Sequence, residues 1–433
     1  MLLGQCARAQ WSCRALCQAL LVVAVVYRAC ASSPFVASGG RNLLRVDDHD
    51  KAAGLRVVKT GMTQLFPSSP QEVHRIPALL AVEDDIVLAF SEQRLNTGDD
   101  NPDNGDINVV MRRSEDGGKS WSDSEPVCDF GTTHVCGNPA PVEDERGRIH
   151  LLVSVNPADS GELSGHVKRS VWQITSLDKG KTWQAPREIS ATVKPSEWQW
   201  YATGPGHGIR LQHQQDNARN GRLVVACDHS EQKSGALRYS SHIIYSDDHG
   251  DTWQLGLSAP EAQRDNSNEA SVVELGNGTL VLSARNYVPG KPTPMSNRLL
   301  SASDDGGYSW AMQEQHPALY GSDCEGSIAL MTRNSPVAVA LLEGGKSEDD
   351  VLIVSHSTKV ARRWPGGPWD RWNLRLSTST DGGRTWPAES SFTLHEGLAG
   401  YSDMQVLRDG TVLVIHETGN EGMNFFRLVP RFS

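Results

Sequence analysis

The sequence predicts an all-β chain folded as a six-bladed β-propeller, and a repeat supports this first. An eight-residue pattern, Ser-x-Asp-x-Gly-x-Thr/Ser-Trp, occurs five times, at 114–121, 176–183, 246–253, 303–310 and 379–386. Successive copies start 62, 70, 57 and 76 residues apart. This spacing is typical of a four-stranded propeller blade with its connections. From residue 70 to the end, about 360 residues at roughly 60–65 residues a blade make six blades.

Short apolar runs between the repeats are the second observation. Runs such as 86–90, 149–155 and 411–416 alternate with Gly, Asn and Asp turns, which favours strands over helices. The clearest hairpin, 272–282, surrounds a Gly-Asn-Gly turn. That turn contains the sequon Asn277-Gly278-Thr279, so we expect Asn277 to be an exposed glycosylation site.

The repeat itself has the chemistry of a hairpin turn. Its Ser and Asp side chains can bond nearby backbone N–H groups, its Gly permits a positive φ, and its Trp returns to the strand and buries a ring. We therefore interpret the repeats as scaffold that reports the fold and not the reaction.

The N-terminus predicts entry into the secretory pathway. Residues 1–31 hold three Arg, no acid, a short apolar run and an Ala-Cys-Ala site, which together indicate a signal peptide. An uncleaved anchor is the alternative, although the apolar run is shorter than the roughly 20 residues that span a bilayer. Residues 32–69 form an N-terminal extension that ends in Pro67-Ser68-Ser69-Pro70, and 70–433 form the propeller.

The cysteines and the net charge indicate which kinds of ligand and partner the protein can have. Four of the eight cysteines lie in the predicted signal peptide, and Cys128 and Cys136 could close a loop disulfide in an oxidising compartment. No Cys-x-x-Cys spacing indicates a metal site, so we expect no metal and no cofactor. The net charge is −11 and no Lys/Arg-rich run is present, which makes nucleic acid an unsuitable partner.

Several residues outside the repeats are not explained by scaffold alone. Arg75 starts an apparent strand, Glu269 and Arg285 can meet across the 272–282 hairpin, Arg371 precedes the fifth repeat, and Tyr401 precedes the last strand pair. Structural readings exist for each: solvated arginines, an ion pair and a buried tyrosine.

Together these segments resemble the sialidase (neuraminidase) family from about residue 70 to the end. The resemblance rests on the Asp-containing repeats, Arg75-Ile76-Pro77, the Arg285-Asn286 strand end, Arg371-Trp372-Asn373-Leu374 and Gly400-Tyr401-Ser402. It implies a six-bladed propeller that hydrolyses terminal α-linked sialic acid from glycoproteins, oligosaccharides and gangliosides.

The resemblance also implies roles for individual residues. Arg75, Arg285 and Arg371 match the three arginines that bind the substrate carboxylate. Tyr401 matches the nucleophile, Glu269 its partner and Asp103 the acid/base. Asp100 is the rival of Asp103, and Arg375 is the rival of Arg371. Arg94 and His207 lie in the stretches 90–94 and 203–209, which are similar to family segments near the pocket.

These residue types suit the chemistry. Guanidinium groups bind carboxylates in a bidentate geometry, so three arginines suit the carboxylate of sialic acid. That carboxylate would repel an acidic nucleophile, and a neutral tyrosine avoids the repulsion; sialidases are known for this departure from the two-carboxylate pattern. Other readings stay open: a non-catalytic glycan-binding propeller or receptor module, and a trans-sialidase that shares the site.

The location of the mature protein has two readings. Among animal members, the N-terminus and Gly204-Pro205-Gly206 look most like the lysosomal sialidase, whereas the C-terminus lacks a Tyr-x-x-apolar sorting tail. We expect either the lysosomal lumen or the extracellular space. Glycolipid substrates would bring the protein to a membrane surface, and the sequence does not set the oligomeric state.

Overall fold

The structure is a computed structural model that describes residues 55–83, 85–96, 105–158, 167–260, 266–287, 293–331, 350–363 and 369–432. The predicted signal peptide, 1–31, lies outside these residues. Among the described residues, no helix is long and apolar enough to cross a membrane. Regular structure is almost entirely strand, as predicted.

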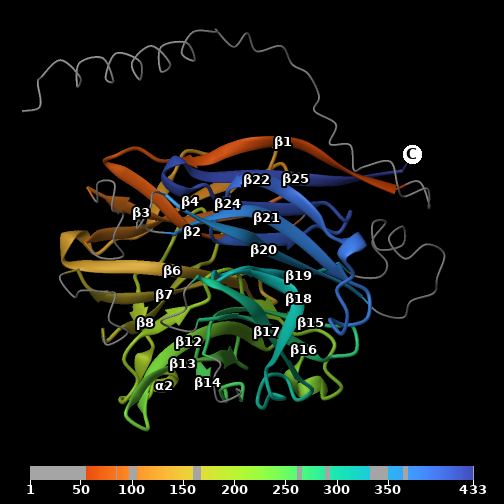
Figure 1. The fold of residues 1–433 in the computed structure, drawn as a ribbon. Coiled ribbons are helices and arrows are strands. Elements are labelled where there is room, and N and C mark those ends of the chain that lie inside the picture. Colours follow the sequence, from red (N-terminus) through yellow and green to blue (C-terminus); the bar gives the residue numbers. More distant parts are fainter. Residues whose placement is uncertain are drawn as a thin grey trace, which may run out of the picture. The chain divides into compact units, whose positions relative to one another are not determined.

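The strands form six antiparallel sheets, and five of them follow one another along the chain (Figure 1). The first blade is β2 (Glu72–Ala81), β3 (Val87–Leu95), β4 (Asp106–Ser114) and β5 (Glu125–Cys128). The second is β6 (His134–Glu143), β7 (Ile149–Pro157), β8 (Ser170–Ser176) and β9 (Arg187–Glu188). The third is β10 (Tyr201–Thr203), β12 (Leu223–Lys233), β13 (Ala236–Ser246) and β14 (Gln254–Leu255), with β11 (Ile209–Arg210) paired to β12.

The remaining blades complete a six-bladed propeller. The fourth is β15 (Ser267–Glu274), β16 (Leu280–Asn286), β17 (Met295–Ser303) and β18 (Glu314–Ser322). The fifth is β19 (Ile328–Met331), β20 (Val351–Arg362), β21 (Trp369–Ser379) and β22 (Phe392–Leu398). The sixth is β23 (Ser402–Val406), β24 (Val412–Glu417), β25 (Gly422–Phe432) and β1 (Leu55–Pro67). The short helices are α2 (Ser190–Val193), η2 (Gly131–Thr133), η4 (Asn217–Arg219), η5 (Ala388–Ser390) and η6 (Gly419–Glu421).

The sixth blade joins both ends of the described chain. β1 pairs antiparallel with β25 from Leu55 opposite Phe432 to Pro67 opposite Gly422, and Figure 1 shows the two strands side by side. The structure therefore starts the propeller at residue 55, whereas the sequence analysis started it at residue 70. A strand outside the repeats carries no repeat signal, which is why it was assigned to the extension.

This closure explains why six blades contain five repeats. Each repeat is the turn between the third and fourth strands of a blade. In the sixth blade the third strand, β25, comes from the end of the described chain and the fourth, β1, from its start. No turn connects them, so this blade has no place for a repeat.

Hydrogen bonds within each repeat follow the predicted turn chemistry. In the first repeat, Gly118 N donates to Ser114 Oγ over 2.8 Å, Ser120 N donates to Asp116 Oδ1 over 2.8 Å, and Ser120 Oγ donates to Asp116 Oδ2 over 2.6 Å. Bonds from Ser120 lower the pKa of Asp116 to about 2. The carboxylate therefore stays ionised and holds the turn.

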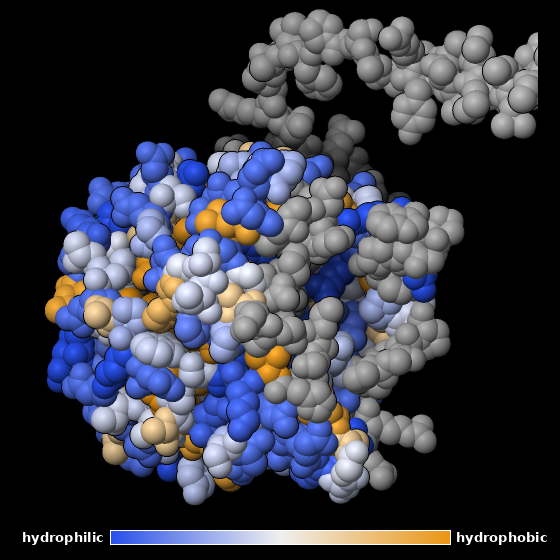
Figure 2. Space-filling model, turned by 90° about the vertical axis from the view of Figure 1, so that its left-hand side faces the viewer, coloured by the Kyte–Doolittle hydropathy of each residue, from blue (hydrophilic) through white to orange (hydrophobic). Residues whose placement is uncertain are grey.

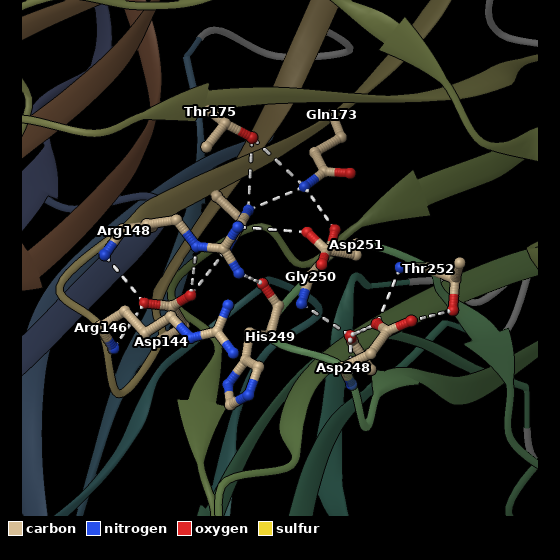
Figure 3. A network of polar contacts seen from close by, with 12 residues as sticks. Asp144, Arg146, Arg148, Gln173, Thr175, Asp248, His249, Gly250, Asp251 and Thr252 are labelled. Atoms are coloured by element: carbon tan, nitrogen blue, oxygen red, sulfur yellow. Dashed lines mark hydrogen bonds and ion pairs between the residues drawn. The ribbon is translucent and has the colours of Figure 1, made fainter.

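A second use of the repeat was not visible in the sequence: its fourth residue offers a carbonyl to the preceding blade. In four repeats that carbonyl accepts a hydrogen bond from an arginine of the blade before it. Figure 3 shows one case, in which Arg148 bonds Asp144 of its own turn and reaches the third repeat at His249 and Asp251. The four bonds are Arg427 Nε to Gly117 O (2.8 Å), Arg113 Nε to Lys179 O (3.0 Å), Arg148 Nη2 to His249 O (2.6 Å) and Arg222 Nη1 to Gly306 O (2.9 Å).

Apolar packing reinforces the same contact. The repeat tryptophans lie against rings of the preceding blade: Trp121 against Phe425 at 5.1 Å and Trp183 against Phe90 at 6.0 Å between ring centroids. The repeat glycine lets the backbone come close to that blade. A Cβ on Gly180, where φ is +80°, would lie 2.7 Å from Leu88 Cδ1.

Two further predictions concern surface and covalent features. The structure contains a disulfide between Cys128 and Cys136, which links the end of the first blade to the start of the second. Asn277 is exposed in the turn between β15 and β16. On the face that Figure 2 shows, hydrophilic residues cover most of the described part, with apolar residues in small separate patches.

Three histidines lie inside the sheets without a charge. His242, His356 and His416 are buried, and burial lowers the pKa of each to about 3. In the unfolded chain each would titrate near 6.5. The fold thus holds these rings neutral across the range in which unfolded histidine gains a proton.

Replacing Gly180 with Ala should weaken the tie between the first two blades. The change combines an unfavourable positive φ with overpacking against Leu88. Gly235→Ala is the matched control, because Gly235 also has a φ of +80° but nothing within 4 Å of an added Cβ. We expect a loss of about 1–2 kcal/mol in the free energy of unfolding for Gly235→Ala, and about 1–3 kcal/mol more for Gly180→Ala. Equal losses in denaturant unfolding would contradict the close-packing role.

Acid should destabilise the fold through the buried histidines. Below pH 6.5 each of these rings binds a proton in the unfolded chain but stays neutral in the folded chain. The free energy of unfolding should therefore fall by about 1.4 kcal/mol per pH unit for each such histidine. His356→Gln should give a shallower slope than the wild type in denaturant unfolding between about pH 7.5 and 5. His213→Gln, at an exposed position, should leave the slope unchanged; identical slopes for all three proteins would refute the assignment.

Candidate functional site

The first strands of neighbouring blades lie beside one another, and a pocket opens among them. β2 lies next to β6 and β23, and β19 lies next to β15 and β23. The pocket has a volume of about 230 Å³ and draws its lining from all six blades. It brings together six residues that the sequence analysis selected: Arg75, Arg94, Glu269, Arg285, Arg371 and Tyr401.

Tyr401 and Glu269 form the polar centre of this pocket. The Tyr401 hydroxyl donates a hydrogen bond to Glu269 Oε1. Arg285 Nη1 contacts both groups, at 2.7 Å from Glu269 Oε2 and 3.1 Å from the Tyr401 hydroxyl. The carboxylate is therefore placed to receive the phenolic proton.

The phenol is held in its neutral form. Burial raises the pKa of Tyr401 well above its usual value, and the charge of Glu269 raises it further, against the opposite effect of Arg285 and Arg371. Ionisation of Tyr401 consequently requires transfer of its proton to a nearby base. Glu269 is the group in contact.

The three arginines differ in how they are paired. Arg75 bonds Glu417 through Nε (3.1 Å) and Nη2 (3.3 Å). Arg285 bonds Asp323 as well as Glu269, with 2.9 Å from Nε to Asp323 Oδ1. Arg371 donates to the backbone oxygen of Asp323 over 3.0 Å, and among the described residues it forms no ion pair with a carboxylate. The pocket thus retains a guanidinium charge that an anion could neutralise.

Arg371 and its rival Arg375 occupy different places. The guanidinium carbon of Arg371 lies 5.2 Å from the centre of the Tyr401 ring, on the side of the pocket. Arg375 instead donates to the carbonyl of Ala388 over 3.1 Å, on the outer part of its blade. The structure therefore places the first of these two arginines, and not the second, in the pocket.

Glu417 is a site residue that sequence reasoning missed. Besides Arg75, its carboxylate accepts bonds from the backbone N–H groups of Ile76 (2.9 Å) and Tyr401 (3.2 Å). Glu417 therefore holds both the guanidinium group of Arg75 and the backbone of Tyr401 in place. Nothing in the sequence distinguishes this acid from others at strand ends, because its partner Arg75 lies more than 300 residues away in the chain.

Arg94 lines the same pocket and is held by a second missed acid. It contacts Glu92 Oε2 through Nε (3.0 Å) and Nη2 (2.6 Å), and Glu92 Oε1 accepts the N–H of Asn138 over 2.8 Å. Arg169 was also missed: its guanidinium carbon lies 3.6 Å from the centre of the Trp200 ring, and both residues line the pocket. Arg94 was selected through the stretch 90–94, which also contains Glu92 but gave it no role, whereas Arg169 and Trp200 have no local signal.

Bulges in the first strands turn these residues toward the centre. The pairing register shifts between Arg75 and Ala78, between Gly137 and Ala140, and between Ser267 and Ala270. Ile76 has a φ of 58°, which is a costly conformation for a β-branched residue. Bulges and strained backbone of this kind are frequent beside functional sites, where they re-aim side chains.

His207, which the sequence analysis placed among the binding residues, lies outside the pocket lining. Its Nδ1 lies 2.9 Å from Asp403 Oδ1. The same carboxylate accepts bonds from Leu79 N and Ser327 Oγ, each over 2.8 Å. His207 thus belongs to a buried junction that connects four blades.

The structure does not describe the predicted acid/base. Asp103 and its rival Asp100 both lie outside the described residues. Within the part of the chain that the structure describes, no group of three His, Cys, Asp or Glu side chains could hold a metal ion. The lining of the described pocket offers guanidinium groups, phenols and carboxylates.

Comparison with known proteins agrees with this arrangement. Residues 95–414 match the family described as "BNR repeat-like domain". A sialidase of Paraclostridium sordellii is 30% identical over 303 residues, and the match covers 64% of this chain and 70% of that protein. The chain belongs to the sialidase family.

Two further comparisons show how much of each related protein the chain covers. A sialidase of Micromonospora viridifaciens is 30% identical over 366 residues, which cover 80% of this chain and 50% of that protein. A solved Hadza microbial sialidase shares the fold at a TM-score of 0.66 and 24% identity, covering 82% of this chain and 65% of the other. The chain spans between 38% and 61% of the length of the first three curated relatives that it matches.

Proposed function

We propose that this protein is an exo-α-sialidase, a glycoside hydrolase that removes terminal α-linked sialic acid with retention of configuration. The observation that supports it best is the pocket itself. It unites Arg371, which has no carboxylate partner among the described residues, with a neutral Tyr401 bonded to Glu269. Membership of the sialidase family supports the same proposal.

The substrate carboxylate would bind among the three arginines. Arg75 and Arg285 are held from behind by Glu417, Asp323 and Glu269, so their orientation is fixed before substrate arrives. Arg371 supplies a guanidinium group that has no carboxylate partner among the described residues. Guanidinium groups held in this way favour a planar carboxylate over a neutral sugar substituent.

The reaction would proceed in two displacements. As the Tyr401 oxygen attacks the anomeric carbon, Glu269 accepts the phenolic proton and the bond to the leaving oxygen breaks. Asp103 would donate a proton to that oxygen, and its carboxylate would then take a proton from water as the water attacks the anomeric carbon and the bond from that carbon to the Tyr401 oxygen breaks. Glu269 returns the proton to Tyr401. Two inversions give net retention.

The proposed substrates and location follow from the same reasoning. Glycoproteins, oligosaccharides and gangliosides all carry terminal sialic acid. The disulfide between Cys128 and Cys136 and the exposed sequon at Asn277 support an oxidising, secretory environment. We place the protein in the lysosomal lumen or outside the cell, where glycolipid substrates would bring it to membrane surfaces.

Tyr401→Phe tests the proposed function. The wild type should release free sialic acid from a soluble α-sialoside without added metal. The variant should lose about a hundredfold or more in kcat because the attacking oxygen is absent, while its Kd for sialic acid changes little. Tyr308→Phe, at an exposed tyrosine of the fourth repeat, should retain wild-type turnover.

Product analysis decides between the proposed function and the alternatives. A wild type that binds sialic acid but releases none would be a binding module. Sialic acid that appears mainly on an added acceptor sugar, and not in solution, would indicate a transferase. Unchanged turnover in Tyr401→Phe would show that the nucleophile is elsewhere.

Arg371→Ala tests the carboxylate site. Loss of a charge-assisted bond should raise the Kd for free sialic acid by about ten- to a hundredfold. Arg375→Ala removes the same charge from the same strand outside the pocket, so its Kd should stay within about threefold of the wild type. Calorimetric titration of both variants gives the comparison. The opposite order of effects would identify Arg375 as the carboxylate ligand.

A further inference from the structure

A groove lies beside the candidate active site and shares one wall with it. It has a volume of about 490 Å³ and is formed by the second blade together with the segment that includes α2. Arg169 lines both the groove and the pocket, and the adjacent residues His134 and Val135 line one each. A cavity of this size is large enough for a small ligand. The two spaces are neighbours on one face of the protein.

The wall of the groove is hydrogen-bonded to a residue that lies close in the sequence to the candidate acid/base. Gly105, two residues after Asp103 in the sequence, donates its N–H to Ala158 O over 3.2 Å. Ala158 follows Pro157, which lines the groove, and its own N–H bonds the carbonyl of Thr133 over 3.0 Å. In a glycosidase the acid/base stands beside the departing oxygen. Gly105 is thus bonded to the wall of the groove. A role of Asp103 as the acid/base would therefore put the leaving group on the groove side of the pocket.

Two lysines give the groove a positive charge. Lys168 and Lys194 both line it, and neither forms an ion pair with a carboxylate among the described residues. Lys194 Nζ donates to Trp198 O over 2.7 Å, which leaves further N–H groups for a ligand. Burial lowers the pKa of Lys194, and the charge of Lys168 lowers it further, so the two ammonium groups are close enough to repel.

Acidic side chains cancel only part of this charge. Among the described residues, Glu188 is the one acid in the lining of the groove, where its Oε1 accepts a bond from Ser190 Oγ over 2.7 Å, and it faces three cationic side chains, those of Lys168, Arg169 and Lys194. Glu197 acts on Lys194 more weakly than Lys168 does. In a protein with a net charge of −11, a concave surface with more cationic than anionic side chains favours an anionic ligand.

We propose that this groove is a subsite for the leaving-group part of the glycan, and that Lys168 and Lys194 bind an acidic sugar there. The proposal rests on the proposed function and extends it to substrate choice. A second sialic acid, with its carboxylate, and a sulfated sugar share the required negative charge. Substrates with an acidic sugar next to the terminal sialic acid would therefore be favoured over those with a neutral one.

The test compares four soluble substrates in the full-length protein. One carries a small aryl leaving group, one a neutral disaccharide, one a second sialic acid and one a sulfated sugar. Lys168→Ala should lower kcat/KM for at least one of the two acidic substrates about five- to tenfold, mainly through KM. The aryl and neutral substrates should stay within about twofold of the wild type. A fall on one acidic substrate alone identifies which anion the groove binds.

Lys119→Ala is the matched control, because Lys119 is an exposed lysine of the first repeat and its loss removes the same charge elsewhere. It should leave all four values unchanged. Equal losses on all substrates, or none on either acidic one, would overturn the subsite while leaving the hydrolase intact. A wild type that hydrolyses none of the four would instead overturn the proposed function and the subsite with it.

Discussion

The contact between each blade and the blade before it is the constraint on which this structure depends. The large hydrophobic clusters lie between neighbouring sheets and contain residues of both. Each repeat strengthens such a contact: its tryptophan packs on the earlier blade, its glycine allows close approach, and in four cases its fourth carbonyl binds an arginine of that blade. Pairing of β1 with β25 completes the ring. The pocket draws on all six blades, so it forms only when every contact is made.

Much of this could be predicted from the sequence because the repeat is local. An octet that recurs at blade spacing indicates the number of sheets, and residues such as Arg75 and Tyr401 stand in distinctive short segments. The missed residues act at long range. Glu417 holds Arg75 of another blade from 342 residues away, and no spacing rule reveals such a partner. Asp323 bonds Arg285 of its own blade, 38 residues away, and its carbonyl bonds Arg371 of the next blade. The strand β1 was missed for a similar reason, since it is recognised only by its pairing with β25.

Two of the three arginines in the pocket are paired with carboxylates, and the third is not. Carboxylates of Glu417, Asp323 and Glu269 hold Arg75 and Arg285, and this pairing reduces the cost of placing guanidinium groups close together. Arg371 has only a carbonyl contact among the described residues. Three arginines fully paired with acids would not attract an anion, and three unpaired ones would repel one another. The observed arrangement fixes two arginines with carboxylates and leaves the Arg371 guanidinium group without a carboxylate contact among the described residues, so that it can bind the ligand.

Different parts of a blade serve stability and the pocket. The third and fourth strands carry the repeats, where Ser, Asp and Gly repeat the same bonds in each copy. The first strands carry bulges at Arg75, Gly137 and Ser267, and the strained Ile76 lies beside one of them. A bulge changes which way a few side chains point without altering the rest of the sheet. Substitutions in the repeat turns should therefore lower mainly the stability of the fold. Substitutions at the bulges of the first strands should change mainly the pocket, because these bulges lie beside it.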